Sequence, residues 1–168
     1  MAERSQPLAV RLRPATAEDG FLLRRWLNDP AIAACGGNRA SWEAEIALAR
    51  LSETALRRIV TVAARPVGYA QALELGLRAG TQPPEIPTGT WDIEVWSMPS
   101  RPRVLAAVPA LLAEEVFATT LAVACSALVS IRQETMVRAY EQAGFRWRRI
   151  WHDPLFGPAW LLLKERPH

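Results

Sequence analysis

The stretch SIRQETMVRAYEQAGF, residues 130–145, has the pattern of one short helix that runs into a strand. Ser130 and Gln133 have the Ser-x-x-Gln spacing of a capping box, which predicts that the helix starts there. Gly144 suits the left-handed position that follows a helix end, which predicts the stop. Three residues spaced three and four apart share the inner face of this helix: Met136, Val137 and Tyr140. The pattern therefore places a tyrosine on the inner face of a helix that stops at Gly-Phe.

The other patterns in the chain predict an α/β protein. Strands are expected at residues 10–13, 59–63, 67–75, 90–96, 121–127, 145–151 and 159–163, with a turn at residues 65–66. Thr16 and Ser41 are expected to cap two helices, and a third helix should run from near Leu105 to Thr119. Pro109 in a helix interior would cost about 3 kcal/mol, so this helix is expected either to start that late or to kink.

The strand at residues 90–96 alternates cleanly between apolar and polar side chains. One face is expected to carry Trp91, Ile93 and Val95, and the other face Asp92, Glu94 and Trp96. The chain has seven tryptophans. Trp26 and Trp91 suit core positions, whereas another four can line a pocket or pack in the core: Trp42, Trp96, Trp147 and Trp151.

Composition bounds the class of protein. A length of 168 residues, half of them hydrophobic, predicts one domain with a sizeable core. No apolar run reaches the roughly 18 residues of a membrane span, and residues 1–14 lack the apolar segment of a signal peptide. Cys35 and Cys125 have no metal or redox spacing, so we expect reduced thiols and a cytoplasmic location.

The positive charge is almost entirely arginine, because Lys164 is the only lysine, and the formal net charge is +3. Arginine favours phosphate, so a nucleic-acid surface is one interpretation, and it predicts steeply salt-dependent binding. The arginines are spread along the chain and are closely matched by acidic residues, so we do not expect a nucleic-acid partner.

Residues 138–145, RAYEQAGF, resemble the Tyr-Glu-Lys-x-Gly-Phe signature of the GNAT acyl-CoA N-acyltransferases. Residues 12–16 and 23–30 resemble the first strand and helix of that superfamily, and residues 66–71, PVGYAQ, resemble its third strand. Within the superfamily, this Gly-Tyr-Ala-Gln and the later Gly157-Pro158-Ala159 are most similar to aminoglycoside 6′-N-acetyltransferases. The resemblance implies a GNAT fold, α/β (α+β), with a mixed, mostly antiparallel sheet flanked by about four helices.

The resemblance also implies an acetyl transfer from acetyl-CoA. Tyr140 corresponds to the tyrosine that protonates the leaving thiolate, and a core tyrosine bonded to the backbone is the alternative. Asp92 and Glu94 are the candidate bases, and two solvated carboxylates are the alternative. The backbone N–H of Val95 or of Trp96 is the candidate oxyanion donor.

The cofactor loop departs from the family pattern. Residues 97–105, SMPSRPRVL, stand where the superfamily has a glycine-rich pyrophosphate loop. The cofactor-binding candidates in this region are Arg101, Arg103, Val104 and Leu105. Either the arginines bind the phosphates directly, or the loop has lost its ligand. Gln133 either contacts the cofactor arm or only caps its helix, and the two histidines give no convincing metal site.

The residues expected to bind the acceptor combine acidic and aromatic side chains, which suits a cationic amine: Trp42, Glu43, Asp92, Trp151 and Asp153. We therefore predict an N-acetyltransferase that acts on a primary amine of a small, cationic acceptor. The alternative is a degenerate GNAT domain that binds or interacts without catalysis. The acceptor, the acyl chain and the oligomeric state stay open, and a homodimer is one arrangement.

Overall fold

The computed structural model describes residues 9–30, 39–77, 83, 85–97, 101–153 and 157–168. Its strands are β1 (Val10–Pro14), β2 (Leu56–Val62), β3 (Arg65–Glu74), β4 (Thr90–Ser97), β5 (Ala124–Ser130), β6 (Arg146–Asp153) and β7 (Gly157–Glu165). Its helices are α1 (Gly20–Leu27), α3 (Arg39–Leu51), α4 (Pro102–Thr119) and α5 (Glu134–Gln142), with short 3-10 turns at Ala17–Asp19 and Leu75–Leu77. The order of strands and helices in the chain agrees with the predicted order.

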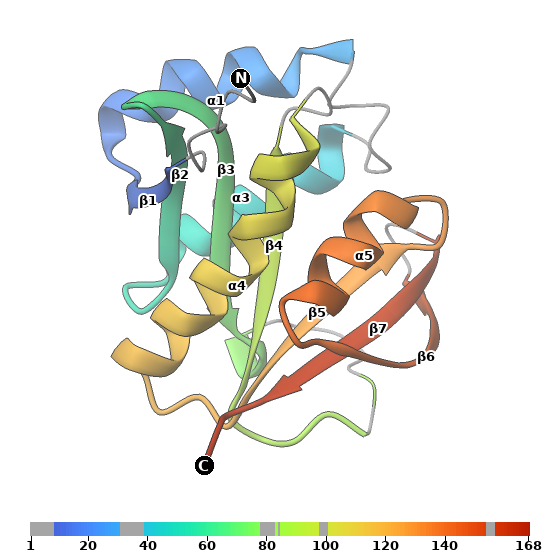
Figure 1. Cartoon of the computed structure of the whole chain (residues 1–168). Helices are drawn as coiled ribbons and strands as arrows, with labels where there is room; N and C mark the ends of the chain where they lie inside the picture. Colours follow the sequence, from blue (N-terminus) through green and yellow to red (C-terminus); the bar gives the residue numbers. More distant parts are fainter. Residues whose placement is uncertain (1–8, 31–38, 78–82, 84, 98–100, 154–156) are drawn as a thin grey trace, which may run out of the picture.

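The strands form one seven-stranded sheet in the order β1-β2-β3-β4-β5-β7-β6. All neighbouring strands are antiparallel except β4 and β5, which are parallel. The expectation of a mixed, mostly antiparallel sheet is confirmed. Because β4 and β5 are parallel, the chain must cross over between them, and α4 makes that crossover (Figure 1).

Helices cover the sheet on both faces (Figure 1). The face under α4 and α5 carries a core cluster that includes Trp91, Ile93 and Val95 of β4. The opposite face packs Trp96 of β4 with residues of α1 and α3, among them Trp26. The predicted alternation of β4 is therefore confirmed, and so is the core position of Trp26 and Trp91.

The parallel pair β4 and β5 separates partway along its length. Register between the two strands covers only Thr90 to Asp92 on β4 and Ala124 to Ser126 on β5. Beyond that point β4 stays paired with β3 as far as Ser97, and β5 stays paired with β7 as far as Ser130. Figure 1 shows the two strands diverging toward the end of the sheet where α5 begins. We call this opening the β4–β5 splay.

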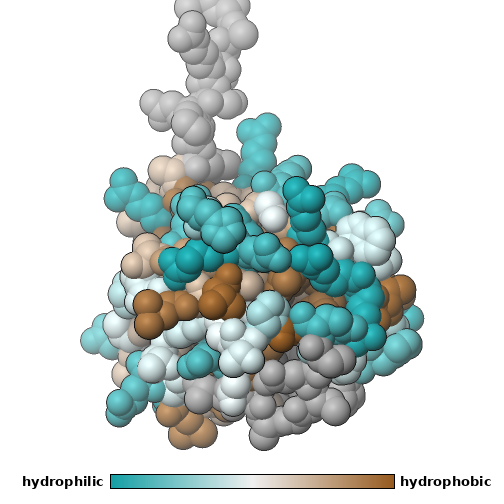
Figure 2. Space-filling model, turned by 90° about the horizontal axis from the view of Figure 1, so that it is seen from below, coloured by the Kyte–Doolittle hydropathy of each residue, from teal (hydrophilic) through white to brown (hydrophobic). Residues whose placement is uncertain are grey.

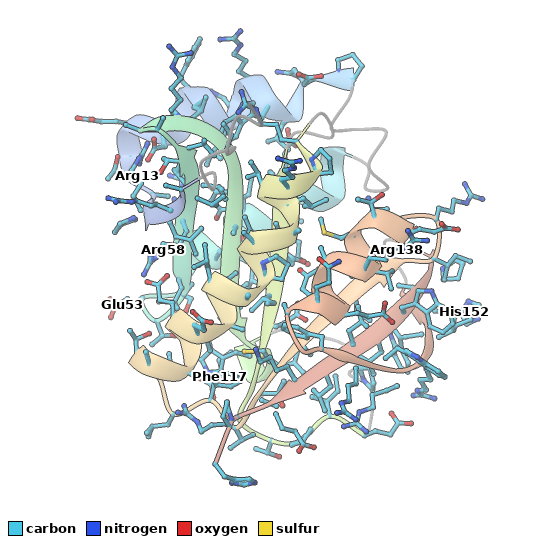
Figure 3. All side chains as sticks on the ribbon, viewed as in Figure 1. Arg13, Glu53, Arg58, Phe117, Arg138 and His152 are labelled. Carbon is cyan, nitrogen blue, oxygen red and sulfur yellow. The ribbon has the colours of Figure 1, made fainter. Side chains whose placement is uncertain are left out.

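An ion pair connects β2, next to the β1 edge of the sheet, with the crossover helix α4. Arg58 of β2, labelled in Figure 3, donates from Nε to both oxygens of Glu115 on α4, at 2.8 and 3.0 Å, and also from Nη2. Both side chains are largely shielded from solvent, with exposures of 15% and 27%.

On the surface seen in Figure 2, hydrophilic and hydrophobic residues are interspersed, as is usual for a protein surface.

The predicted start of the signature helix was wrong, whereas its predicted stop is confirmed. Helix α5 begins at Glu134, its N-cap Gln133 makes no side-chain cap bond, and Ser130 is the last residue of β5. Pairing with β7 holds Ser130 in the sheet, which outweighs the local capping pattern. At the other end Gly144 has φ of +90°, and its N–H donates to the Glu141 carbonyl at 3.0 Å.

The predicted start of the crossover helix was also wrong. Helix α4 begins at Pro102, so Pro109 lies inside it. Pro102 at the first helical position loses nothing by lacking an N–H and has its φ preset for a helix. Val108 and Leu112 are fully buried against the sheet, and this packing offsets the bond that Pro109 cannot make.

Two further boundaries differ from the prediction. Strand β5 spans Ala124–Ser130 rather than residues 121–127, and Leu121 is 95% exposed. The β2–β3 turn falls on Ala63 and Ala64, with φ of 48° and 63°, rather than on residues 65–66. Val62 pairs with Arg65 across it, which is the geometry of a two-residue type I′ hairpin built without glycine or asparagine.

Candidate active site

Tyr140 lies at the mouth of the β4–β5 splay. It extends from α5 into the core, is 2% exposed, and packs edge-on against Phe145 at 5.1 Å between ring centroids. Its hydroxyl donates to the carbonyl oxygen of Ile93 at 3.4 Å. Ile93 directly follows Asp92, the last β4 residue paired with β5. The tyrosine hydroxyl is therefore located where β4 and β5 part.

The environment of Tyr140 keeps its proton in place. Burial raises the pKa of Tyr140 well above its ordinary value of 10, and the negative charges of Asp92 and Glu94 raise it further. Full proton transfer from such a phenol to a thiolate, whose pKa is about 8.5, is uphill. The raised pKa disfavours loss of the proton, so the Tyr140 hydroxyl stays a hydrogen-bond donor, as it is toward the Ile93 carbonyl.

Asp92 and Glu94 lie on the α3 face of β4, the opposite face from the α4 core. Asp92 is 4% exposed and accepts a hydrogen bond on Oδ1 from the hydroxyl of Ser126 at 2.9 Å. Glu94 is half-buried and accepts on Oε2 from the side-chain amide of Gln71 at 2.7 Å. The alternative of two solvated carboxylates is wrong for Asp92, because a carboxylate that is 4% exposed has lost almost all contact with water.

The backbone of β4 distinguishes the two oxyanion candidates. In a strand the N–H and C=O of one residue point to the same edge, and successive residues alternate between edges. The Ile93 carbonyl points into the splay, where it meets Tyr140, so the N–H of Val95 points the same way. By the same alternation the backbone N–H of Trp96 points toward β3, where Trp96 is in register with Tyr69. Of the two, Val95 has the N–H that faces the splay.

The N-terminus of α4 offers arginine side chains rather than a glycine cradle. Arg101 and Arg103 are exposed, whereas the side chains of Val104 and Leu105 are buried in the core. The N–H groups of Val104 and Leu105 both bond to the Arg101 carbonyl at 3.1 Å. Pro102 offers no N–H at this helix end, whereas the two guanidinium groups beside it are exposed. Residues 98–100 of the predicted loop lie outside the described residues.

Gln133 stands at the carboxyl end of β5 and opens α5. Its N–H donates to the Ser130 carbonyl at 2.9 Å, and its side chain is half-buried and makes no cap bond. The interpretation that the Gln133 side chain caps its helix is therefore wrong, and contact with the coenzyme arm stays a prediction.

The expected acceptor residues are only partly described. Glu43 is exposed on α3, and Trp151 is half-buried on β6 with the Arg149 guanidinium 5.1 Å from its ring. The side chains of Trp42 and Asp153 lie outside the described residues. The remaining expected pocket tryptophans lie apart: Trp96 is buried at 5% exposure, and Trp147 is 59% exposed, with its ring tilted by 60° to that of Trp160. Among the described residues, no group of three or more His, Cys, Asp or Glu could hold a metal ion.

Comparison with protein-family profiles and with curated protein sequences finds no match. Solved structures do match. The aminoglycoside acetyltransferase AAC(6')-Ib in complex with coenzyme A superposes with a TM-score of 0.79 at 23% identity, over 94% of this chain and 95% of that chain. The same enzyme with ribostamycin and coenzyme A gives 0.77 at 25% identity, over 94% and 93%. An aminoglycoside N(6')-acetyltransferase from Legionella pneumophila gives 0.69 at 14% identity, over 96% and 94%.

The chain adopts the GNAT fold. The predicted fold class and the resemblance to aminoglycoside 6′-N-acetyltransferases are both confirmed at the level of the fold. At these identities the likeness establishes the fold and leaves the acceptor to be argued from the site. Among the described residues of this GNAT fold, no helix is both long and apolar enough to cross a membrane.

Sequence reasoning missed the polar residues that surround the candidate bases. Four of them are buried or half-buried near Asp92 and Glu94: Glu45, Arg57, Gln71 and Ser126. The signal for Gln71 was present, because it shares one face of its strand with Tyr69 and Leu73, two large side chains that suit burial. A glutamine at a position that alternation assigns to a buried face needs partners, and partners on other strands are invisible in the sequence.

Proposed function

We propose that the chain is an N-acetyltransferase that moves an acetyl group from acetyl-CoA to a primary amine of a small cationic acceptor, with an aminoglycoside as one option. The observation that carries the proposal is the splay: the Tyr140 hydroxyl bonds to β4 where β4 and β5 part, and the charges of Asp92 and Glu94 on the same strand act on that hydroxyl. Its support is the fold shared with acetyltransferases solved with coenzyme A and with ribostamycin.

The carboxylates supply the chemistry for a cationic acceptor. An ammonium group must approach the acyl carbon and lose a proton before it can attack. Glu94, which is half-buried, is the better placed of the two to receive the amine and pass its proton to water. Asp92 is buried and bonded to Ser126, so its part is to supply negative charge that favours the cation.

The donors at the splay supply the chemistry for the acyl group. When bound, acetyl-CoA supplies an activated thioester carbonyl and a thiolate leaving group. The N–H of Val95 would stabilise the oxygen of that carbonyl as it gains negative charge, in a site shielded from water. The Tyr140 hydroxyl would exchange its long 3.4 Å bond to the Ile93 carbonyl for a stronger bond to the departing sulfur.

The arginines at the start of α4 take the place of the glycine loop in this proposal. Arg101 and Arg103 are exposed beside a helix N-terminus, where the dipole adds to their positive charge. Side-chain donors replace backbone donors, so we expect phosphate binding to be more sensitive to salt than in a glycine-cradled site. Gln133 is the further candidate for contact with the coenzyme arm.

The test is acetyl-CoA-dependent thiol release with a panel of amines that includes aminoglycosides, polyamines and neutral primary amines. The proposal predicts turnover that is higher for cationic amines and that falls at least about 100-fold in Glu94→Gln, the low end of the usual contribution of a general base. Release that is the same with and without every amine would overturn it and favour the non-catalytic alternative.

A further inference from the structure

A row of polar side chains crosses three strands on the α3 face of the sheet. Arg57 of β2 is in register with Gln71 of β3, and Gln71 is in register with Glu94 of β4. Gln71 is 1% exposed, which makes it one of the largest fully buried side chains in the described chain. A primary amide this deep in a protein would be destabilising unless its hydrogen bonds were made.

The partners of Gln71 fix which way its amide points. Nε2 lies 2.7 Å from Oε2 of Glu94 and 3.3 Å from the backbone carbonyl oxygen of Glu45 on α3. An ionised carboxylate and a carbonyl can only accept hydrogen bonds, so the NH2 group of the amide must face them. The amide oxygen therefore faces the Tyr69 hydroxyl, which is 2.9 Å away and must donate.

Tyr69 is well suited to remain the donor. Burial raises the pKa of Tyr69 to about 12, partly opposed by Arg57, so the hydroxyl keeps its proton at neutral pH. Its ring is wedged beside Trp96, with the two ring centroids 5.4 Å apart. The result is a chain of bonds with one direction, from Tyr69 through the amide to the carboxylate.

We propose that Gln71 is a positioning residue for acetyl transfer, because its amide holds the Glu94 carboxylate ionised and in one orientation at the acceptor side of the splay. The inference rests on the proposed function and deepens it. Through the bond to the Glu45 carbonyl, the same amide ties that orientation to the position of α3. The position of α3 and the orientation of the carboxylate are thereby linked through one side chain.

Other ionisable groups also face Glu94 and must be separated from the effect of Gln71. The Glu94 charge acts on Tyr69 of β3 and Tyr140 of α5, Asp92 shares its strand, and Arg57 of β2 and Glu45 of α3 flank Gln71. None of these groups is altered in charge when Gln71 is replaced by a neutral side chain, so a change in pH profile would report on the lost hydrogen bond.

The experiment compares Gln71→Met, which conserves volume, and Tyr69→Phe with Thr61→Val, a control that removes a buried hydroxyl on β2 outside the site. For Gln71→Met we expect the acceptor KM to rise about tenfold and the acetyl-CoA KM to stay unchanged. The acidic limb of the kcat/KM profile should move up by about one pH unit, the effect of one lost bond to a carboxylate. Tyr69→Phe should also move the acidic limb of the profile up, but by less than one pH unit.

A second background isolates the path through the carboxylate. In Glu94→Gln, adding Gln71→Met should change kcat/KM by less than about twofold, because residues that act through one another are not additive. An equal tenfold loss in both backgrounds would overturn the positioning role and leave Gln71 as a structural residue. Should Gln71→Met fail to fold, Tyr69→Phe carries the same comparison in both backgrounds, and a profile identical to the parent would overturn it.

A readout without turnover separates this inference from the proposed function. The 13C-carboxyl titration midpoint of Glu94, followed by NMR in the free protein, should rise by about one pH unit in Gln71→Met. An unchanged midpoint overturns the inference whether or not the chain is an enzyme. If the midpoint rises but the chain acetylates no amine, the role of Gln71 in keeping Glu94 ionised is supported and the proposed acetyltransferase activity is rejected.

Discussion

Replacing Tyr140 with phenylalanine distinguishes a catalytic role of its hydroxyl from a purely structural role in the core. The change removes one oxygen and leaves the ring in its edge-on contact with Phe145, 5.1 Å between centroids. The hydrogen bond that this hydroxyl donates to the Ile93 carbonyl is long, at 3.4 Å. A bond this long contributes about 0.5 kcal/mol net, so Tm should fall by only about 1–2 °C.

The expected effect on turnover is far larger than the effect on stability. If Tyr140 donates a hydrogen bond to the departing thiolate, kcat should fall by about 100-fold, the low end of the loss when one donor to developing negative charge is removed. Acceptor and acetyl-CoA KM values should stay within about threefold, because the bond strengthens only as charge develops. Initial rates of thiol release, together with thermal unfolding of the same samples, measure both quantities.

The chain has two tyrosines, so Tyr69→Phe makes the same atomic change on the opposite face of the sheet. It should alter the acceptor KM, through Gln71, more than kcat. A kcat for Tyr140→Phe within threefold of the parent, in a protein that unfolds at a clearly lower temperature, would show that Tyr140 is a core residue and would refute the reasoning.

Three further predictions concern stability. Ala63→Asn with Ala64→Gly should raise the free energy of unfolding by about 1 kcal/mol, because both positions have positive φ in a type I′ turn, and an unchanged urea midpoint would contradict this. Arg166→Met should lower that free energy by about 3 kcal/mol, because three charge-assisted bonds of 2.7–2.8 Å from its guanidinium close the end of α4. Urea unfolding checks this as well, and a loss below about 1 kcal/mol would contradict it. The Arg13 hydrogen bond lowers the pKa of Asp19 to about 2, so the parent should lose stability as pH falls from about 4 toward 2, a dependence that Asp19→Asn should lack in acid unfolding curves.

Local chemistry was predictable wherever it depends on one or two residues. Gly144 ends its helix because glycine adopts positive φ freely, and the alternation of β4 assigned Asp92 and Glu94 to one face. Non-local pairing defeated the local pattern at Ser130, which β7 holds in the sheet. The late helix start predicted from Pro109 failed for a similar reason, because the apolar face of α4 packs on the sheet on both sides of Pro109.

The immediate surroundings of the candidate site could not be predicted from the sequence. Gln71 and Glu94 are 23 positions apart, and Ser126 and Asp92 are 34 positions apart, and only strand register brings them together. The splay itself is a property of the pairing between β4, β5 and β7, since no residue in either strand encodes it alone. Burial of Asp92 follows from that geometry rather than from its neighbours in the chain.

Phe117 at the lower end of α4, labelled in Figure 3, illustrates the same limit. Its ring lies 5.2 Å from the Arg166 guanidinium, and its backbone carbonyl accepts a bond of 2.8 Å from the same group. The two residues are 49 positions apart, and nothing in the local sequence of either one indicates the contact.

Thermal unfolding with and without acetyl-CoA, with free CoA as the comparison, tests the central claim most directly. At about one hundred times its dissociation constant a ligand adds about 2.7 kcal/mol, which should raise Tm by about 5–10 °C for a chain of this size. The shift should be largely lost in the double variant Arg101→Ser, Arg103→Ser, whose side chains are exposed in the free protein and whose own Tm should be unchanged. No shift of the parent at millimolar acetyl-CoA would contradict the acetyltransferase and leave a GNAT fold with a different role.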